Sequence, residues 1–229
     1  MKDLIAFFLK TGKVKHLKQR GYVLRGVRNP PTVGGHSFRE ALMAWILGDM
    51  GNSGLDTNKL VKIALVHDLC AGYAGDLTPY EPLIKKAGRK DIKRVFIGWV
   101  RLPKKEKELF YKLQRTKERK SLKELTTHLP KPLALQLNRL WDEYEQGSTR
   151  EGRFIQQVDM LENFLEALEC WKEDKNFPIE SWWQQMKELM NDPILLDFLG
   201  DIDSHFYKKV LAARKKNAKK REEARRAPR

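Results

Sequence analysis

The sequence predicts an all-α protein that ends in a basic helical tail, and three observations predict it. Apolar residues recur at spacings of three and four along most of the 229 residues, as they do on one face of a helix. Few segments show the strict alternation of apolar and polar residues that is typical of a strand. Hydrophobic residues make up 41% of the chain and charged residues 33%, which is enough for a core and a soluble helical surface.

The N-terminal half begins with residues 1–21, whose apolar patch is short and lacks a small-residue cleavage site. This segment is therefore expected to form a short amphipathic helix rather than a signal peptide. Helical spacing then predicts helices over 36–47 and 60–69. Nothing approaches the roughly 20 apolar residues of a membrane span, so no membrane contact is expected.

The C-terminal half has clearer signals for where helices begin and end. The lysine-rich stretch 104–123 is expected to be a solvated helix face broken by turns, and Pro132 is expected to open the next helix. Gly147 breaks that helix, and Ser148 or Thr149 is the candidate N-cap of another. Pro178 is expected near the start of a further helix, and the Asp192-Pro193 pair marks one more turn. We expect one domain over residues 1–200 and a basic tail over 201–229.

Charge is concentrated at the C-terminus. Residues 207–229 contain eleven Lys or Arg and two Glu, so they carry +9 of the total charge of +15. The main body is only mildly basic, and global charge is no reason to assign nucleic-acid binding. Cys70 and Cys170 lie far apart and outside any CxxC pattern, which favours two buried thiols in a reducing cytoplasm.

The polar residues that interrupt the apolar pattern carry the chemistry. The apolar segment 60–66 ends in the pair His67-Asp68, which by itself is more often a helix cap than a ligand pair. His36 begins an earlier apolar helix, and Asp159 lies beside an apolar stripe, where a carboxylate is costly unless it is bound or paired. Imidazole and carboxylate groups are good ligands for a divalent metal ion.

These motifs resemble the HD superfamily of metal phosphohydrolases, and most closely its small 5′-deoxynucleotidases. The resemblance covers about residues 5–175. It rests on the segments Arg20–Tyr22, Arg25–Val27, His36–Arg39, Ala64–Leu69, Gly75–Leu77, Leu140–Glu145, Ser148–Phe154 and Asp159–Glu162. The resemblance implies an HD-domain helical bundle.

The resemblance also implies roles for single residues. His36, His67, Asp68 and Asp159 would bind one divalent ion (Mn, Co, Zn, Mg or Ni), which activates water and offsets charge on phosphorus. Asp76 would lie near the attacking water or the leaving oxygen. Further expected contacts to the substrate are Arg20 or Arg25 to the 5′-phosphate, and Tyr22, which flanks the sugar or packs in the core.

The chain departs from the family pattern at Ala71, where the family has a glutamate that positions or deprotonates the nucleophilic water. Alanine cannot hold a proton. Three explanations stay open: an engineered inactive variant, a natural enzyme that uses Asp76 or another carboxylate, or a scaffold without turnover. Gly34-Gly35 replaces the usual acidic residue before the first histidine, and Gly152 replaces a usual alanine.

The expected function is hydrolysis of (deoxy)nucleoside 5′-monophosphates by a cytoplasmic homo-oligomer, as a dimer, with activity impaired by Ala71. Another phosphate substrate, such as a triphosphate or a cyclic nucleotide, is compatible with the same motif. The alternative is a disabled scaffold that binds nucleotide or nucleic acid with the help of residues 207–229.

Overall fold

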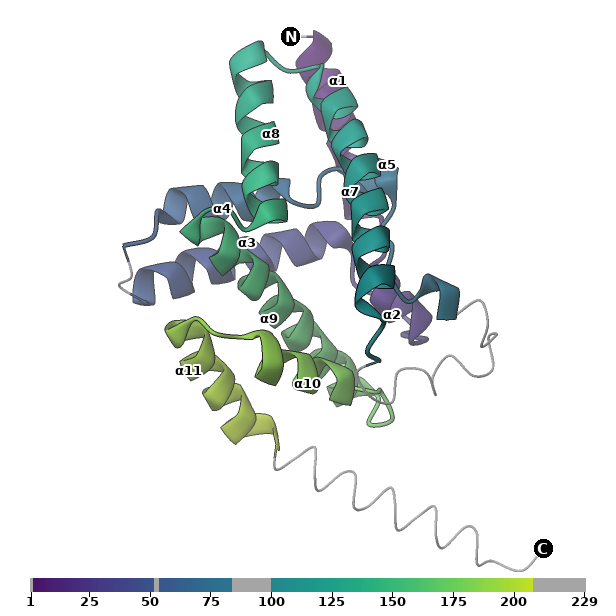
Figure 1. Ribbon diagram of the computed structural model, residues 1–229, viewed down its shortest axis with the longest axis vertical. Coiled ribbons are helices and arrows are strands. Elements are labelled where there is room, and N and C mark those ends of the chain that lie inside the picture. Colours follow the sequence, from purple (N-terminus) through teal and green to yellow (C-terminus); the bar gives the residue numbers. More distant parts are fainter. Residues whose placement is uncertain (1, 52–53, 84–99, 208–229) are drawn as a thin grey trace, which may run out of the picture.

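The protein is helical throughout the part that the computed structural model describes, residues 2–51, 54–83 and 100–207 (Figure 1). The all-α prediction is confirmed, and within these residues β-pairing amounts to one antiparallel bridge between Lys18 and Thr32. The elements are α1 (Lys2–Thr11), η1 (Gly12–Lys15), α2 (Arg20–Leu24), α3 (Val33–Met50), α4 (Thr57–Val66), α5 (Ala71–Ala74), α7 (Lys104–Thr126), α8 (Lys131–Gln146), α9 (Arg150–Glu173), α10 (Glu180–Leu189), α11 (Pro193–Ile202) and η2 (Asp203–Tyr207).

Side-chain caps explain where several helices begin. The Thr32, Asp56 and Asp192 side chains accept hydrogen bonds from backbone N–H groups in the first turns of α3, α4 and α11. Of the two candidate caps for α9, the structure uses Thr149, whose hydroxyl accepts from the Gly152 N–H at 3.1 Å. Gly147 ends α8 in the left-handed region, with φ +55°, as the expected break requires.

Helix α9 is the centre of the bundle. Helices α3, α4, α8, α10 and α11 all pack against it, while α7 packs on α8, α5 and α1 (Figure 1). The fully buried side chains of α9 include Ile155, Val158, Leu161 and Phe164. Burial of such side chains contributes roughly 1.5–3 kcal/mol each, so α9 holds the core together and fixes the polar residues that it carries.

The expectation of a broken helix over 104–123 is wrong. Helix α7 runs without interruption from Lys104 to Thr126. No Gly or Pro occurs in this stretch, and its Lys, Glu, Arg and Leu residues all favour the helix. Its buried side chains, Leu122, Leu125 and Thr126, lie near its C-terminal end, so the rest of the helix is held mainly by local propensity.

Helices α8 and α9 come very close at Gly152. A Cβ on Gly152 would lie 2.3 Å from the carbonyl oxygen of Glu143 in α8. The two backbones therefore meet where a side chain would be, so a larger residue at position 152 requires the helices to shift.

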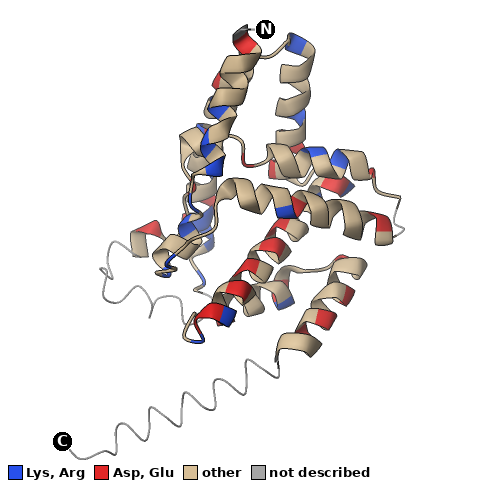
Figure 2. Ribbon diagram, turned by 180° about the vertical axis from the view of Figure 1, so that it is seen from behind, with Lys and Arg blue, Asp and Glu red and all other residues tan. Residues whose placement is uncertain are grey.

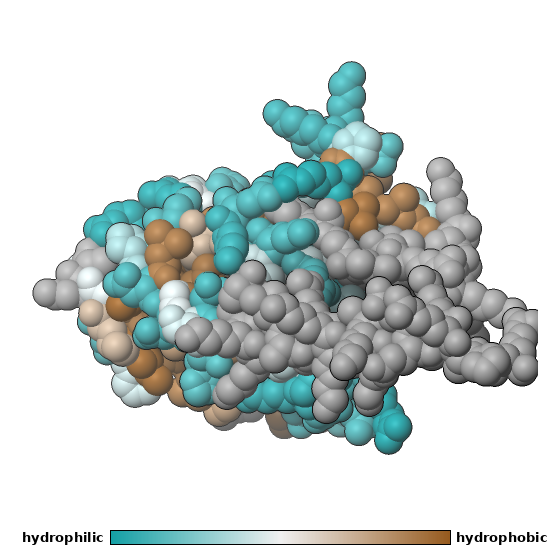
Figure 3. Space-filling view, turned by 90° about the horizontal axis from the view of Figure 1, so that it is seen from below, coloured by the Kyte–Doolittle hydropathy of each residue, from teal (hydrophilic) through white to brown (hydrophobic). Residues whose placement is uncertain are grey.

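The surface agrees with a charged helical bundle. Figure 3 shows a hydrophilic face with separate hydrophobic patches. No described helix carries an apolar stretch that is long enough to cross a bilayer. Both cysteines are free and buried, as expected. The basic tail beyond residue 207 lies outside the described residues, so the expected domain boundary and tail helix stay predictions.

Candidate metal centre

Two histidines from different helices meet in the interior. His36 lies in the first turn of α3, and His67 is the C-cap of α4. Their side chains are buried, and their ring centroids are 5.6 Å apart. Helices α3 and α4 pack closely along their lengths, which brings the two motifs together across 31 residues of sequence.

Each histidine has one ring nitrogen held by a fixed partner. The Nδ1 of His36 makes a short hydrogen bond with the Glu162 carboxylate, and the Nδ1 of His67 donates to the Ala64 carbonyl oxygen at 2.9 Å. The Nε2 atoms face the predicted carboxylates. His36 Nε2 is 3.2 Å from Asp159 Oδ1, and His67 Nε2 is 3.3 Å from Asp68 Oδ2. Such outer hydrogen bonds are typical of metal-binding histidines because they fix the tautomer.

Asp159 is supported by two residues that the sequence did not single out. The Tyr144 hydroxyl donates to Asp159 Oδ2 at 2.7 Å, and the Asn163 amide donates to Asp159 Oδ1 at 2.8 Å. The Tyr144 ring also packs on His67, with centroids 4.7 Å apart. Asn163 lies one helical turn after Asp159, so helical spacing is the signal that could have identified it.

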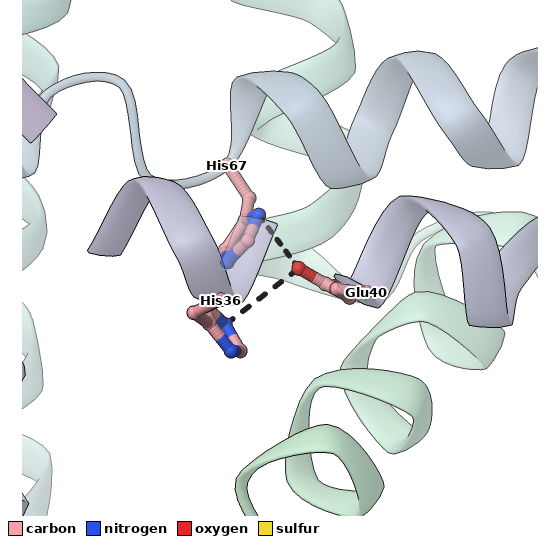
Figure 4. A group of neighbouring side chains, drawn as sticks. All are labelled: His36, Glu40 and His67. Carbon is pink, nitrogen blue, oxygen red and sulfur yellow. Dashed lines mark ion pairs between the residues drawn. The ribbon is translucent and has the colours of Figure 1, made fainter. Parts of the chain in front are cut away.

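Glu40 is a third residue of the centre that the sequence did not single out. It follows His36 by one helical turn on α3 and is fully buried. Figure 4 shows its carboxylate between the two imidazoles, with Oε2 3.7 Å from His36 Nε2 and 3.3 Å from His67 Nδ1. The His-x-x-x-Glu spacing places Glu40 on the same helical face as His36, but within an apolar stripe that equally predicts core packing.

An acidic stripe on α9 faces this part of α3. Asp159, Glu162, Glu166 and Glu169 follow one another at helical spacing, and Figure 2 shows the acidic residues running along the helix. Arg39 binds three of them, with contacts of 2.8 Å to Glu162, 2.6 Å to Glu166 and 2.7 Å to Glu169. Arg39 therefore ties α3 to α9 directly beside the histidines.

The carboxylates control the charge of both histidines. Burial lowers the pKa of His67, but the charges of Asp68 and Glu40 outweigh burial and raise the pKa to about 10. Burial also lowers the pKa of His36, and its hydrogen bonds with Asp159 and Glu162 raise that pKa well above its usual value. Both imidazoles therefore carry a positive charge at neutral pH when no metal ion lies beside them.

The acidic partners shift in different directions. Burial raises the pKa of Asp159, but the hydrogen bond and charge of His36 outweigh burial and lower it to about 2. Burial raises the pKa of Glu40 to about 8, although both histidines oppose the shift. Burial likewise raises the pKa of Asp76 to about 6, against the hydrogen bond from the Arg20 backbone.

A cavity of about 350 Å³ opens beside the centre. Its lining includes all four predicted metal ligands together with Asp76, Tyr22, Arg25, Tyr144, Asn163 and Trp182. Residue type rather than volume distinguishes this cavity. Another cavity, of about 410 Å³, is larger, but none of the described residues that line it is a histidine. The fold thus gathers the sequence-predicted residues around one hollow.

The two candidate arginines have different surroundings. The Arg20 guanidinium pairs with Glu81 at 2.7 and 2.9 Å, and Arg20 is not among the residues that line the cavity. Its backbone N–H instead donates to Asp76 Oδ2 at 2.6 Å. Arg25 lines the cavity and stacks on Trp182, 3.8 Å from the ring centroid. Burial lowers the pKa of Arg25 to about 10, which leaves the side chain charged at neutral pH.

Tyr22 is both a packing residue and a wall of the cavity. It is 1% exposed, and its ring stacks with Phe177 and Trp182. Its hydroxyl donates to the Asn163 carbonyl oxygen at 2.5 Å, which connects α2 to α9. The two expectations for Tyr22, sugar contact and core packing, are therefore compatible in one side chain.

The departures from the family pattern also have a structural setting. Ala71 begins α5 and is buried. Its side chain is a methyl group, so it offers no acid to the centre. A Cβ on Gly34 would lie 3.2 Å from backbone atoms of η1, and a Cβ on Gly35 would lie 3.2 Å from the capping oxygen of Thr32. Gly34 thus permits the close approach of α3 to η1, and Gly35 leaves room for the Thr32 cap.

The residues present fit a divalent ion. His36, Glu40 and His67 each offer a ligand atom, and these atoms lie within 4.8 Å of one another. The donor set of imidazole nitrogen and carboxylate oxygen suits such an ion. In addition, neither carboxylate oxygen of Glu40 has a hydrogen-bond partner, so its buried charge is offset by the two imidazolium rings in the metal-free chain and would be offset by the ion in the loaded one.

Comparisons with known proteins agree with this geometry. A protein-family model described as an HD domain matches residues 11–196. The human 5′-deoxynucleotidase HDDC2 is 27% identical over 213 residues, which cover 93% of this chain and 90% of that protein.

Solved structures share the fold. A conserved hypothetical protein from Pyrococcus furiosus superposes with a TM-score of 0.62 at 23% identity, over 87% of this chain and 99% of that one. A protein from Magnetospirillum magnetotacticum, described as a predicted metal-dependent phosphohydrolase, gives a TM-score of 0.58 at 19% identity, covering 93% of each chain.

Proposed function

The chain belongs to the HD domain family, and from that premise we propose that it is a metal-dependent phosphomonoesterase acting on deoxynucleoside 5′-monophosphates. The observation that carries the proposal is the meeting of His36 and His67 beside a cavity that also contains Asp68, Asp159 and Arg25. The substrate class follows from the relatives named 5′-deoxynucleotidases, which the chain matches over most of its length.

We assign the four sequence-predicted ligands to one divalent ion. His36 and His67 supply Nε2, and Asp159 and Asp68 supply the oxygens that already face these nitrogens at 3.2 and 3.3 Å. Tyr144 and Asn163 orient Asp159 through their hydrogen bonds. The ion would supply positive charge for the phosphate and for the water that attacks it.

The other polar residues of the cavity take the remaining roles. Arg25 holds the 5′-phosphate, since its planar guanidinium can donate two parallel hydrogen bonds and stays charged in the cavity. Trp182 and Tyr22 provide an apolar wall for the sugar or base. Asp76 accepts the proton from the attacking water, because its raised pKa of about 6 places it near the working pH.

The test is phosphate release from a panel of deoxynucleoside 5′-monophosphates with Mn²⁺ or Co²⁺, for this chain and for Ala71→Glu side by side. If the unaltered chain is impaired by the missing glutamate, Ala71→Glu should increase kcat by about 10²–10⁴-fold. Equal activity of both proteins would assign the base to another group, with Asp76 first, which Asp76→Asn then tests. Inactivity of both, with metal bound, would reject the monophosphate substrate and favour the nucleotide-binding or nucleic-acid-binding alternative.

A further inference from the structure

Glu40 occupies the most protected position of the metal centre. It is 0% exposed and lies on α3 one turn after His36. Its Oε2 is 3.3 Å from His67 Nδ1 and 3.7 Å from His36 Nε2, so the carboxylate lies between the two imidazoles (Figure 4). This position makes Glu40 the link between the histidines of α3 and α4.

No described group satisfies the Glu40 carboxylate by hydrogen bonding. Both of its oxygens are buried without a hydrogen-bond partner. A buried carboxylate in that condition is rare and costly. The neighbouring donors point elsewhere: Arg39 binds the acidic residues of α9, and the Tyr144 hydroxyl binds Asp159.

A purely structural ion pair with the histidines accounts poorly for this arrangement. The Nδ1 of His67 donates to the Ala64 carbonyl at 2.9 Å, and the Nδ1 of His36 binds Glu162. The remaining His36 nitrogen is nearer to Asp159, at 3.2 Å, than to Glu40, at 3.7 Å. A contact of 3.7 Å is too long for a hydrogen bond. Glu40 is therefore close to both rings without being the primary partner of either.

We propose that Glu40 is a further ligand of the divalent ion, beyond His36, His67, Asp68 and Asp159. This inference rests on the metal site of the proposed function. The ligand atoms of His36, Glu40 and His67 lie within 4.8 Å of one another, the arrangement that one ion can bridge. A third carboxylate makes the donor set harder, so Glu40 shifts the preference of the site toward Mn²⁺ and Mg²⁺ and away from Zn²⁺.

The experiment measures binding of Mn²⁺ and Zn²⁺ to the full metal-free chain by calorimetry, for the unaltered protein and for Glu40→Gln. The amide keeps the shape of the side chain and removes its charge. We expect Glu40→Gln to weaken Mn²⁺ binding by at least about tenfold, as loss of a ligand does, and to weaken Zn²⁺ binding less. Equal affinity of the two proteins for Mn²⁺ overturns the proposal, and so does an equal loss for both ions.

A control variant and the unaltered chain distinguish failure of this inference from failure of the proposed function. Glu166→Gln removes a carboxylate of α9 that binds Arg39 and does not contact the histidines, so its affinity for Mn²⁺ should be unchanged. If the unaltered chain binds no divalent ion, the proposed function fails together with this inference. If it binds Mn²⁺ and Glu40→Gln binds equally well, only the assignment of Glu40 fails.

A direct measurement covers the case in which Glu40→Gln does not fold. Crystals of the unaltered chain with Mn²⁺ would locate the ion by anomalous scattering. A Glu40 oxygen at about 2.2 Å from the ion, as expected for a carboxylate ligand, supports the proposal. A Glu40 carboxylate outside the coordination sphere overturns it.

Discussion

The ring nitrogens of His67 have separate partners. Nδ1 donates to the Ala64 carbonyl, and Nε2 faces Asp68, so a backbone atom fixes the tautomer and a side chain faces the proposed ion. His36 follows the same arrangement with Glu162 and Asp159. The two histidines are thus prepared for a cation by groups from α4, from the turn that follows α4 and from α9.

Replacing one of these ligands should empty the site. We expect His67→Ala or Asp68→Ala to abolish binding of the divalent ion, measured as metal content after dialysis. His16→Ala is the matched control, because His16 is exposed at the end of η1 and should leave metal content unchanged. Full metal occupancy in His67→Ala would contradict the ligand assignment.

Metal affinity should increase with pH. Without a cation, His67 is protonated up to a pKa of about 10, and a metal ion must displace that proton. Each proton that is released lowers the Kd for Mn²⁺ about tenfold per pH unit in the neutral range, so release from both His36 and His67 should lower it about a hundredfold. Calorimetry at two pH values, in buffers of different ionisation enthalpy, measures both the Kd and the protons released. A Kd that is independent of pH would show that His67 does not bind the ion.

The sequence could predict the residues that carry an obvious motif and missed those that depend on packing. His36, His67, Asp68, Asp76 and Asp159 could be identified by type and order, and all of them line one cavity. Glu40 and Tyr144 were missed because their side chains point inward only once α3, α4 and α8 have packed together. Arg20 and Arg25 could not be separated, since the pairing of Arg20 with Glu81 depends on the fold.

At the scale of the helices, the apolar periodicity and the cap and helix-breaking residues predicted most of the elements. Thr149 is one of the two caps that the sequence indicated for α9, and its side chain accepts a backbone hydrogen bond. Asp192, where the sequence indicated a turn, caps α11 in the same way. The error at α7 has a different origin. A lysine-rich stretch with few apolar residues resembles interrupted structure, but strong helix formers without Gly or Pro sustain a helix with little burial.

The contact between α8 and α9 gives a prediction about stability. Gly152→Ala should lower the free energy of unfolding by about 1–3 kcal/mol, because the new Cβ meets the Glu143 backbone and the helices must shift. Gly200→Ala in α11 is the matched control, since no atom lies within 4 Å of its Cβ position. There the higher helix propensity of alanine should add about 0.5–1 kcal/mol. Chemical denaturation measures both, and an unchanged Gly152→Ala would mean that α8 and α9 are farther apart.

At the scale of the whole molecule, acidic and basic residues are concentrated in different parts of the chain. Acidic residues gather along α9 (Figure 2), while the largest excess of basic residues in the sequence lies in 207–229. The family assignment concerns residues 11–196 and leaves the basic tail outside. Homodimerisation and a cytoplasmic location stay predictions from the sequence, because they depend on partners and compartments beyond a single chain.

Removing the tail should separate catalysis from any nucleic-acid binding. A chain that ends at residue 207 loses the whole +9 charge and keeps every residue of the centre. We expect unchanged metal content and phosphate release, together with loss of oligonucleotide binding measured by fluorescence anisotropy. Binding by the full chain should weaken steeply between about 50 and 200 mM salt. If the shortened chain still binds the oligonucleotide, the binding surface lies on the helical bundle and not in the tail.

The stacking of Arg25 on Trp182 has a consequence for optical experiments. Trp182 is the only tryptophan among the described residues that line the cavity, and the guanidinium covers its ring at 3.8 Å. A phosphate that draws Arg25 away, or a base that takes its place, changes the polarity around this indole. Titration with a deoxynucleoside monophosphate should therefore change the tryptophan emission. Trp182→Phe should abolish that change, so the protein carries its own fluorescent reporter of ligand entry.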